Sequence, residues 1–160
     1  MNIFVTDPDP TVSARVLPDK HIVKMPLETC QMLSIVCSKE WGHDYGKIYR
    51  NDGQPYQTTK GAFRNHPCTI WANDTQANAW WLLTHGIALS LEYTHRYGKI
   101  HSCHRPLLEA RDLLPSADYT KHTPFVFAGP DQFKYDKTID IFTAYTVSYT
   151  HLTLPTKRIV

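Results

Sequence analysis

The chain has 160 residues, a length that fits one domain, and its apolar content of 42% is enough for one hydrophobic core. The formal charge of +2, with nine neutral histidines, argues against a protein that coats nucleic acid by charge alone, but it allows a local basic groove. No apolar run approaches the roughly 18 residues that a membrane-spanning helix needs, and the start of the chain does not resemble a signal peptide.

The cysteine pattern indicates a reducing compartment. No two of the four cysteines have the C-x-x-C spacing of a zinc or redox motif, and the pair Cys30 and Cys37 lies on one face of an expected helix, where it belongs to the core. We therefore expect a monomeric, soluble protein of the cytoplasm that does not bind membranes.

The first forty residues predict a short arm followed by helices. The β-branched run from Ile3 to Val5 predicts a short strand or an extended arm. One helical turn is expected from Thr11 to Val16 after an N-cap. A longer helix is expected from Asp19 to about Ser38, and Pro26 inside it should kink or split the helix.

The middle of the chain predicts a long loop and a second long helix. Residues Trp41 to Lys60 show no clear period and read as a loop, with a hairpin at Asn51-Asp52-Gly53. A turn follows at Arg64 to Pro67. The second long helix is expected to start at Thr69 or Asp74 and to end at Tyr97, before the C-cap glycine Gly98.

The last third predicts a shorter helix, from Ser102 to Leu114, then a loop from Pro115 to Phe133 and a final helix that starts at Thr138 and runs to Tyr145. The expected fold class is therefore mainly α, with residues 1–146 forming a single helical domain with long loops and an extended N-terminal arm.

The last fourteen residues have a different character. Residues 147–156 read VSYTHLTLPT, which looks like the translation of a transposon-end adapter used in sequencing libraries. We expect a metagenomic gene whose natural chain continues after Thr146 with other residues, so that residues 147–160 are a non-native tail that packs poorly.

Two polar stripes run along the long helices. At 100° per residue, four side chains of the first helix fall within about 80° of each other, opposite an apolar arc. The stripe of the first helix contains His21, Lys24, Glu28 and Gln31, and that of the second contains Asn78, Trp81, His85, Glu92 and Arg96.

Each stripe carries a histidine and a glutamate seven residues apart, which is two helical turns. If the stripes face each other, His21, Glu28, His85 and Glu92 line one polar cleft. Solvated helix faces, or His–Glu hydrogen-bond networks that tie the helices together, would explain the same pattern.

Most basic side chains outside the first helix lie near the end of the long loop or near the end of the second helix. They are either scattered over the surface or line a groove that binds phosphates. These residues are Lys60, Arg64, His66, Arg96, Lys99, His101, His104 and Arg105.

Four segments resemble a family of short proteins from marine tailed phages, over nearly the whole of Met1 to Tyr145. The segments are MNIFVTDPDP, DKHIVKMPLETCQMLS, NHPCTIWA and LEYTHRYGKIH. This resemblance indicates kinship with a phage protein and brings little information on activity.

A second resemblance, to a family of enzymes, indicates an activity. Asp19, His21 and Glu28 are similar in spacing to the Asp-x-His and the catalytic Glu of pyrimidine-dimer DNA glycosylases of the endonuclease V type. Further matches to that family are Asn65, His66 and Pro67 before a helix, and Glu92, Arg96, Tyr97 and Gly98 at a helix end.

The resemblance implies a DNA glycosylase and AP lyase that acts on damaged pyrimidines without a cofactor or metal. The N-terminal amine, here that of Met1, attacks the sugar, a Schiff base forms and elimination cuts the strand. The implied catalytic residues are Met1, Glu28 and His21, with Glu28 stabilising the sugar cation and moving protons. DNA is the implied partner, contacted through Lys24, Arg64, His66, Arg96 and Lys99.

Two departures from that family concern the site itself. Asn2 is too large for easy removal of Met1, and Leu27 and Gln31 stand where the family has basic residues beside the glutamate. Two other functions stay open: a metal-dependent enzyme that uses the two His–Glu pairs, although helical-bundle metal sites space Glu and His by three residues, and a non-enzymatic phage protein that binds a host partner.

Overall fold

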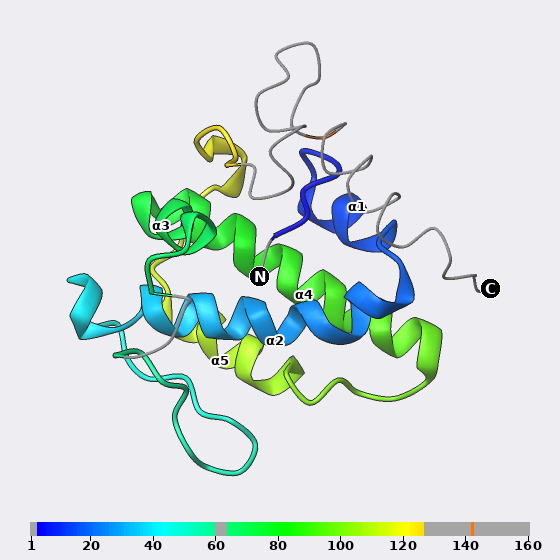
Figure 1. Ribbon diagram of the computed structural model, residues 1–160, viewed down its shortest axis with the longest axis horizontal. Helices are drawn as coiled ribbons and strands as arrows, with labels where there is room; N and C mark the ends of the chain where they lie inside the picture. The colour runs from blue at the N-terminus through cyan, green and yellow to red at the C-terminus, as the bar shows by residue number, and fades with distance from the viewer. Residues whose placement is uncertain (1–2, 60–63, 127–141, 143–160) are drawn as a thin grey trace.

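The computed structural model describes residues 3–59, 64–126 and 142, and this part of the chain is a bundle of helices (Figure 1). Five α-helices and two 3₁₀ turns follow each other along the chain. They are α1 (Pro10–Arg15), α2 (Asp19–Val36), η1 (Lys39–Trp41), α3 (Pro67–Asp74), α4 (Gln76–Tyr97), α5 (His104–Leu113) and η2 (Tyr119–Lys121). The described residues contain no β-strand, which confirms the predicted mainly α class. None of the described helices combines the length and the apolar character needed to cross a membrane.

Helices α2 and α4 form the centre of the molecule and run antiparallel, with α1 and α5 packed against them (Figure 1). Arg96, near the end of α4, contacts Asp19 at the start of α2. In the middle of the pair, Gly86 lies so close to α2 that a Cβ atom there would meet Thr29 Cγ2 at 2.5 Å. The absence of a side chain at Gly86 therefore allows the two helices to approach each other closely.

Helix α2 passes through Pro26 without a break. It begins after Pro18, and Asp19 in its first turn interacts favourably with the positive end of the helix dipole. The prediction that Pro26 would split the helix is therefore wrong, and the helical register from His21 to Glu28 is kept. Both side chains share one face of α2, as their spacing predicts.

The second long helix, α4, begins at Gln76, close to the later of its two predicted starts, Asp74, and well after the earlier one, Thr69. The chain breaks at Thr75, whose extended backbone separates α3 from α4 and whose hydroxyl accepts a hydrogen bond from the Asn78 amide. Helix α3 begins at Pro67, a position that favours proline because the missing N–H has no helical partner. Gly98 ends α4 in the left-handed conformation, as predicted.

The described part of the N-terminal arm forms no strand, and its backbone turns at Phe4. Ile3 and Val5 are buried in the main core, which also holds Leu33, Trp71 and Leu83. The four cysteines are buried free thiols, as the sequence predicts. In the long loop, the predicted hairpin at residues 51–53 is present as a turn closed by a single bridge between Tyr49 and Pro55.

The C-terminal third agrees with the sequence as far as it is described. Helix α5 spans His104–Leu113, against the predicted 102–114, and the loop that follows includes the turn η2. Apart from Phe142, whose ring lies 5.9 Å from that of Phe125, the expected last helix at 138–145 lies outside the described residues. The proposed adapter tail, residues 147–160, lies outside them as well.

Candidate active site around Glu28

Glu28 is a buried carboxylate in the middle of α2. Only 4% of the residue is exposed, and its Oε2 lies 3.7 Å from Nζ of Lys24, one turn earlier on the helix. The Lys24 side chain is 66% exposed, so its ammonium stands at the surface beside the buried acid. Burying a carboxylate costs free energy unless polar groups compensate it. Buried ionisable groups are therefore concentrated at functional sites.

The N-terminal arm contacts the same face of α2. The ring of Phe4 stacks on the imidazole of His21, with centroids 4.3 Å apart and planes 18° from parallel. Burial, together with the charges of Lys20 and Lys24, lowers the pKa of His21 to about 4, so the imidazole is neutral near pH 7. Because His21 precedes Glu28 by two turns, the arm and the carboxylate share one face of the helix.

The arm is also fixed to α4. Ile3, the first described residue, has its carbonyl oxygen 3.1 Å from Nε2 of His85, and Nδ1 of the same ring lies 3.0 Å from the carbonyl oxygen of Pro10. Burial lowers the pKa of His85 to about 4, outweighing the two carbonyls, which raise it. Met1 and Asn2, and with them the predicted nucleophile, lie outside the described residues.

Glu92 belongs to a different environment. Its Oε2 accepts a hydrogen bond from Nε of Arg96 at 2.8 Å, and it lines a groove between α1 and α4 together with Arg15 and His95. The structure thus corrects the single cleft predicted from the two His–Glu pairs. His85 binds the arm and Glu92 binds Arg96, although their spacing places both on one face of α4.

Of the predicted DNA-binding residues, Lys24 is the one beside Glu28. Arg64 and His66 precede α3, and the charge of Arg64 acts on Glu40, just beyond the C-terminal end of α2. Arg96 lies at the opposite end of α2, and the exposed Lys99 follows α4. These cations therefore mark both ends of α2 and do not form one groove leading to Glu28.

Two of these residues also have partners within the protein. Arg96 donates hydrogen bonds to Asp19, Glu92 and the carbonyl of Arg15. Nδ1 of His66 accepts a hydrogen bond from the Cys68 amide and so caps α3. Both residues thus stabilise the fold, whatever else they contact.

The described residues give no support to the metal-enzyme alternative. Within ranges 3–59 and 64–126, no group of three or more histidine, cysteine, aspartate or glutamate side chains could hold a metal ion. The members of the two His–Glu pairs have other partners. Both histidines contact the arm, whereas Glu28 lies beside Lys24 and Glu92 binds Arg96.

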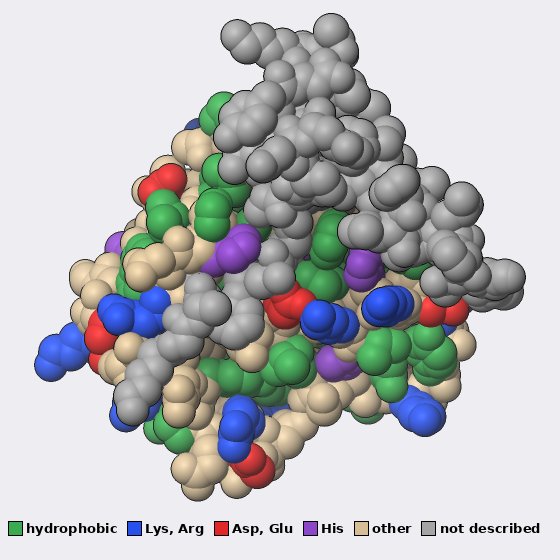
Figure 2. Space-filling model, in the orientation of Figure 1, with side chains coloured by type: hydrophobic (Ala, Val, Ile, Leu, Met, Phe, Trp, Pro, Cys, Tyr) green, Lys and Arg blue, Asp and Glu red, His purple; other side chains and the backbone are tan. Residues whose placement is uncertain are grey.

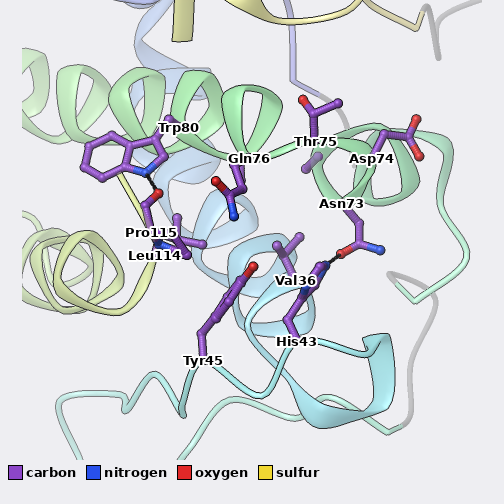
Figure 3. Close-up of a pocket in the computed structure, with 12 residues that line it drawn as sticks. Val36, His43, Tyr45, Asn73, Asp74, Thr75, Gln76, Trp80, Leu114 and Pro115 are labelled. Carbon is purple, nitrogen blue, oxygen red and sulfur yellow. Dashed lines mark hydrogen bonds between the residues drawn. The ribbon is translucent and has the colours of Figure 1, made fainter. Parts of the chain in front are cut away.

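Sequence reasoning missed a second hollow, at the other end of α2 (Figure 3). A cavity of about 140 Å³ lies among Val36, Tyr45, Gln76 and Trp80. At its edge the His43 ring stacks on Tyr45, with centroids 4.9 Å apart, and Nε2 of His43 lies 2.8 Å from Oδ1 of Asn73. No pattern in the sequence predicts this cavity.

One comparison with known proteins identifies a family. The sequence model of one family, described as pyrimidine dimer DNA glycosylase, matches residues 1–105. No curated protein and no solved structure matches the chain. The family match covers well over half of the chain and includes the arm, α2, α3 and α4, so the chain belongs to this family.

Proposed function

We propose that this chain, as a member of the pyrimidine dimer DNA glycosylase family, excises damaged pyrimidines from DNA and then cuts the strand, with Glu28 as the catalytic carboxylate and the N-terminal amine as the nucleophile. The observation that carries the proposal is the stacking of Phe4 on His21. It holds the described end of the arm on the face of α2 that bears a buried glutamate.

Chain length limits where the amine can meet the substrate. Two residues separate the amine of Met1 from the nitrogen of Ile3, and two extended residues span at most about 7 Å. From His21 to Glu28 the helix rises about 10 Å, at 1.5 Å per residue. The amine and the carboxylate would therefore meet at a sugar bound between His21 and Glu28, because both groups have to reach the same carbon.

The chemistry needs a neutral amine and a carboxylate. An α-amino group with a pKa near 8 leaves a reactive neutral fraction at pH 7. Its lone pair would attack C1′ of the damaged nucleotide, and the bond from C1′ to the base would break, the base leaving with the bonding electrons and a proton. The amine gives up one of its two protons in this step. The sugar ring then opens as O4′ takes a proton from the carboxyl group of Glu28 or from water, which gives a Schiff base whose nitrogen keeps the second proton.

Strand cleavage follows by elimination. A proton leaves C2′, the 3′ phosphate departs with the electrons of its bond to C3′, and water finally releases the amine. The carboxylate of Glu28 would stabilise the positive charge at C1′ and carry protons to and from these centres. Nζ of Lys24 lies 3.7 Å from this carboxylate, within reach of a phosphate bound beside it.

The face around Glu28 suits a nucleic acid. Figure 2 shows basic side chains beside an acidic one over α2. Lys20 and Lys24 of this helix are both exposed. Leu27, which is 41% exposed, and the half-buried Gln31 complete the surface next to the carboxylate. Lysines can fix the position of phosphates, whereas an exposed leucine offers an apolar contact to a base extruded from the stack.

Borohydride trapping tests this function. Incubating the protein with duplex DNA that holds either a cyclobutane pyrimidine dimer or an abasic site, in the presence of borohydride, should yield a covalent complex, and an undamaged duplex should yield none. Peptide mapping by mass spectrometry should place the adduct on the N-terminal peptide. An adduct on a lysine such as Lys24, or no adduct on either DNA, would contradict the proposed mechanism.

A further inference from the structure

The arm that carries the proposed nucleophile adopts a backbone conformation that the chain does not prefer. Phe4 has a φ of 54°, in the left-handed region. This region is strained for a bulky residue, and such a conformation persists only when the surrounding contacts impose it. The arm is therefore held in place, and the contacts that hold it can be identified.

Contacts from two helices fix the backbone on both sides of Phe4. His85 on α4 binds the Ile3 carbonyl at 3.1 Å. The hydroxyl of Ser13 on α1 donates to the Phe4 carbonyl at 3.3 Å and accepts from the Thr6 amide at 3.0 Å. The strained residue thus lies between two anchored peptide groups, while its ring stacks on His21.

A second anchor on α4 supports the first. The indole of Trp81 stacks on the His85 ring, with centroids 5.1 Å apart, and its Nε1 donates to the Pro8 carbonyl at 2.9 Å. His85 is only 1% exposed, and its two ring nitrogens face the carbonyls of Ile3 and Pro10. The neutral ring carries one N–H and donates to Ile3 when that proton is on Nε2. The buried side chain of His85 thus lies between the start of the arm and the first residue of α1.

We infer that His85 is a positioning residue for the N-terminal nucleophile: it fixes the Ile3 carbonyl, two residues from the amine, and so keeps the arm in the strained turn that directs the amine to Glu28. The inference rests on the proposed function. Without the contact to Ile3, the turn at Phe4 can relax to an ordinary extended conformation, and the preceding chain would swing away. Displacing a reacting group by about 1 Å can cost on the order of 100-fold in rate.

A merely structural role for His85 makes a different prediction, and the chain offers a matched control. His101 is also a buried histidine bound to a backbone carbonyl, with Nε2 2.8 Å from the Val23 oxygen, but it does not touch the arm. Its Nδ1 accepts a hydrogen bond from the Cys103 amide. Replacing either histidine removes a buried hydrogen bond and destabilises the fold, but only the change at His85 should move the arm.

The experiment compares wild type, His85→Gln and His101→Gln on a duplex with an abasic site. We expect His85→Gln to slow borohydride trapping 10- to 100-fold in single turnover, with a DNA Kd within threefold of wild type, and to speed hydrogen exchange of the Thr6 amide. His101→Gln should change neither trapping nor Thr6 exchange. Ser13→Ala, which removes the contacts to Phe4 and Thr6, should slow trapping in the same way. This variant tests the inference if His85→Gln does not fold.

The outcomes separate the two proposals. A wild-type protein that traps no DNA overturns the proposed function. If wild type traps DNA but His85→Gln and Ser13→Ala trap it at the same rate, or if His101→Gln is equally slow, the positioning role of His85 is overturned and the proposed function stands.

Discussion

Arg96, near the end of α4, donates a hydrogen bond of 2.8 Å to the carboxylate of Asp19, the first residue of α2. The same guanidinium binds Glu92 one turn earlier on its own helix and the Arg15 carbonyl at the end of α1. Burial lowers the pKa of Arg96, but the two carboxylates outweigh this and raise it, so the group stays charged. One side chain thus joins three helices.

Replacing Arg96 should therefore affect stability more than DNA binding. Arg96→Lys keeps the charge but cannot make three contacts in the planar arrangement of a guanidinium. We expect a loss of about 2 kcal/mol in the free energy of unfolding, the typical size for hydrogen bonds to charged groups, measured by urea denaturation. Lys99→Gln, an exposed change at the same end of the molecule, should leave the urea midpoint unchanged. A normal midpoint with weakened DNA binding in Arg96→Lys would instead indicate a direct phosphate contact.

Removing the charge of Glu28 should stop the reaction but leave binding intact. Glu28→Gln keeps the shape of the side chain, yet it can neither accept a proton nor balance the charge that develops at the sugar. A loss of at least about 100-fold in the single-turnover rate is expected, within the range of general acid–base catalysis, with DNA affinity within threefold by fluorescence anisotropy. Glu109→Gln, which alters an ion pair with Arg105 on α5, is the matched control and should react normally. A fully active Glu28→Gln protein would remove the carboxylate from the mechanism.

Acid should destabilise the protein through its buried neutral histidines. His85 has a pKa of about 4 in the fold, against an ordinary value near 6.5, so the unfolded chain binds more protons between these two pH values. Stability contributed by neutral His85 is complete above pH 6.5 and is lost as pH falls toward 4, by on the order of 3 kcal/mol. His21 acts in the same direction.

Thermal melting at pH 7 and pH 5 tests this prediction. The drop in Tm from pH 7 to pH 5 should be clearly smaller in His85→Gln than in wild type, because glutamine does not titrate. Equal drops in the two proteins would show that folding does not change the pKa of His85.

The spacing between α2 and α4 should be sensitive to a single methyl group. In Gly86→Ala the new Cβ would lie 2.5 Å from Thr29 Cγ2 and 3.1 Å from Leu107 Cδ2, so a neighbour must move. Overpacking of this kind costs about 1 to 3 kcal/mol, more than the helix gains from alanine. Because Thr29 follows Glu28, trapping should also slow. Ala79→Gly, a change elsewhere on α4, should lose stability by about 1 kcal/mol without slowing trapping.

Local patterns predicted most of the helices. The apolar period of 3.6, the cap at Gly98 and the turn at residues 51–53 each depend on neighbours in the chain, and all three are present. Of the two predicted starts of the second long helix, Asp74 lies two residues from the observed start at Gln76, whereas the separate helix α3 was not predicted. The predicted effect of Pro26 was a kink or a split, and the split is wrong because α2 continues through this residue.

The site was harder to predict, because its decisive contacts are not local. Spacing placed His21 and Glu28 on one face, and resemblance to the family assigned their roles. Spacing also paired His85 with Glu92, but the partner of His85 is a carbonyl 82 residues away in the sequence. Backbone acceptors look alike in every residue, so no pattern of side chains marks them.

That long separation also sets the order in which the fold is completed during synthesis. His85 and Trp81, which hold the arm, leave the ribosome some eighty residues after Ile3. Contacts between distant parts of a chain form slowly, because the intervening loop must first be closed. The arm can therefore dock only after α4 has been made, although its own residues are synthesised much earlier.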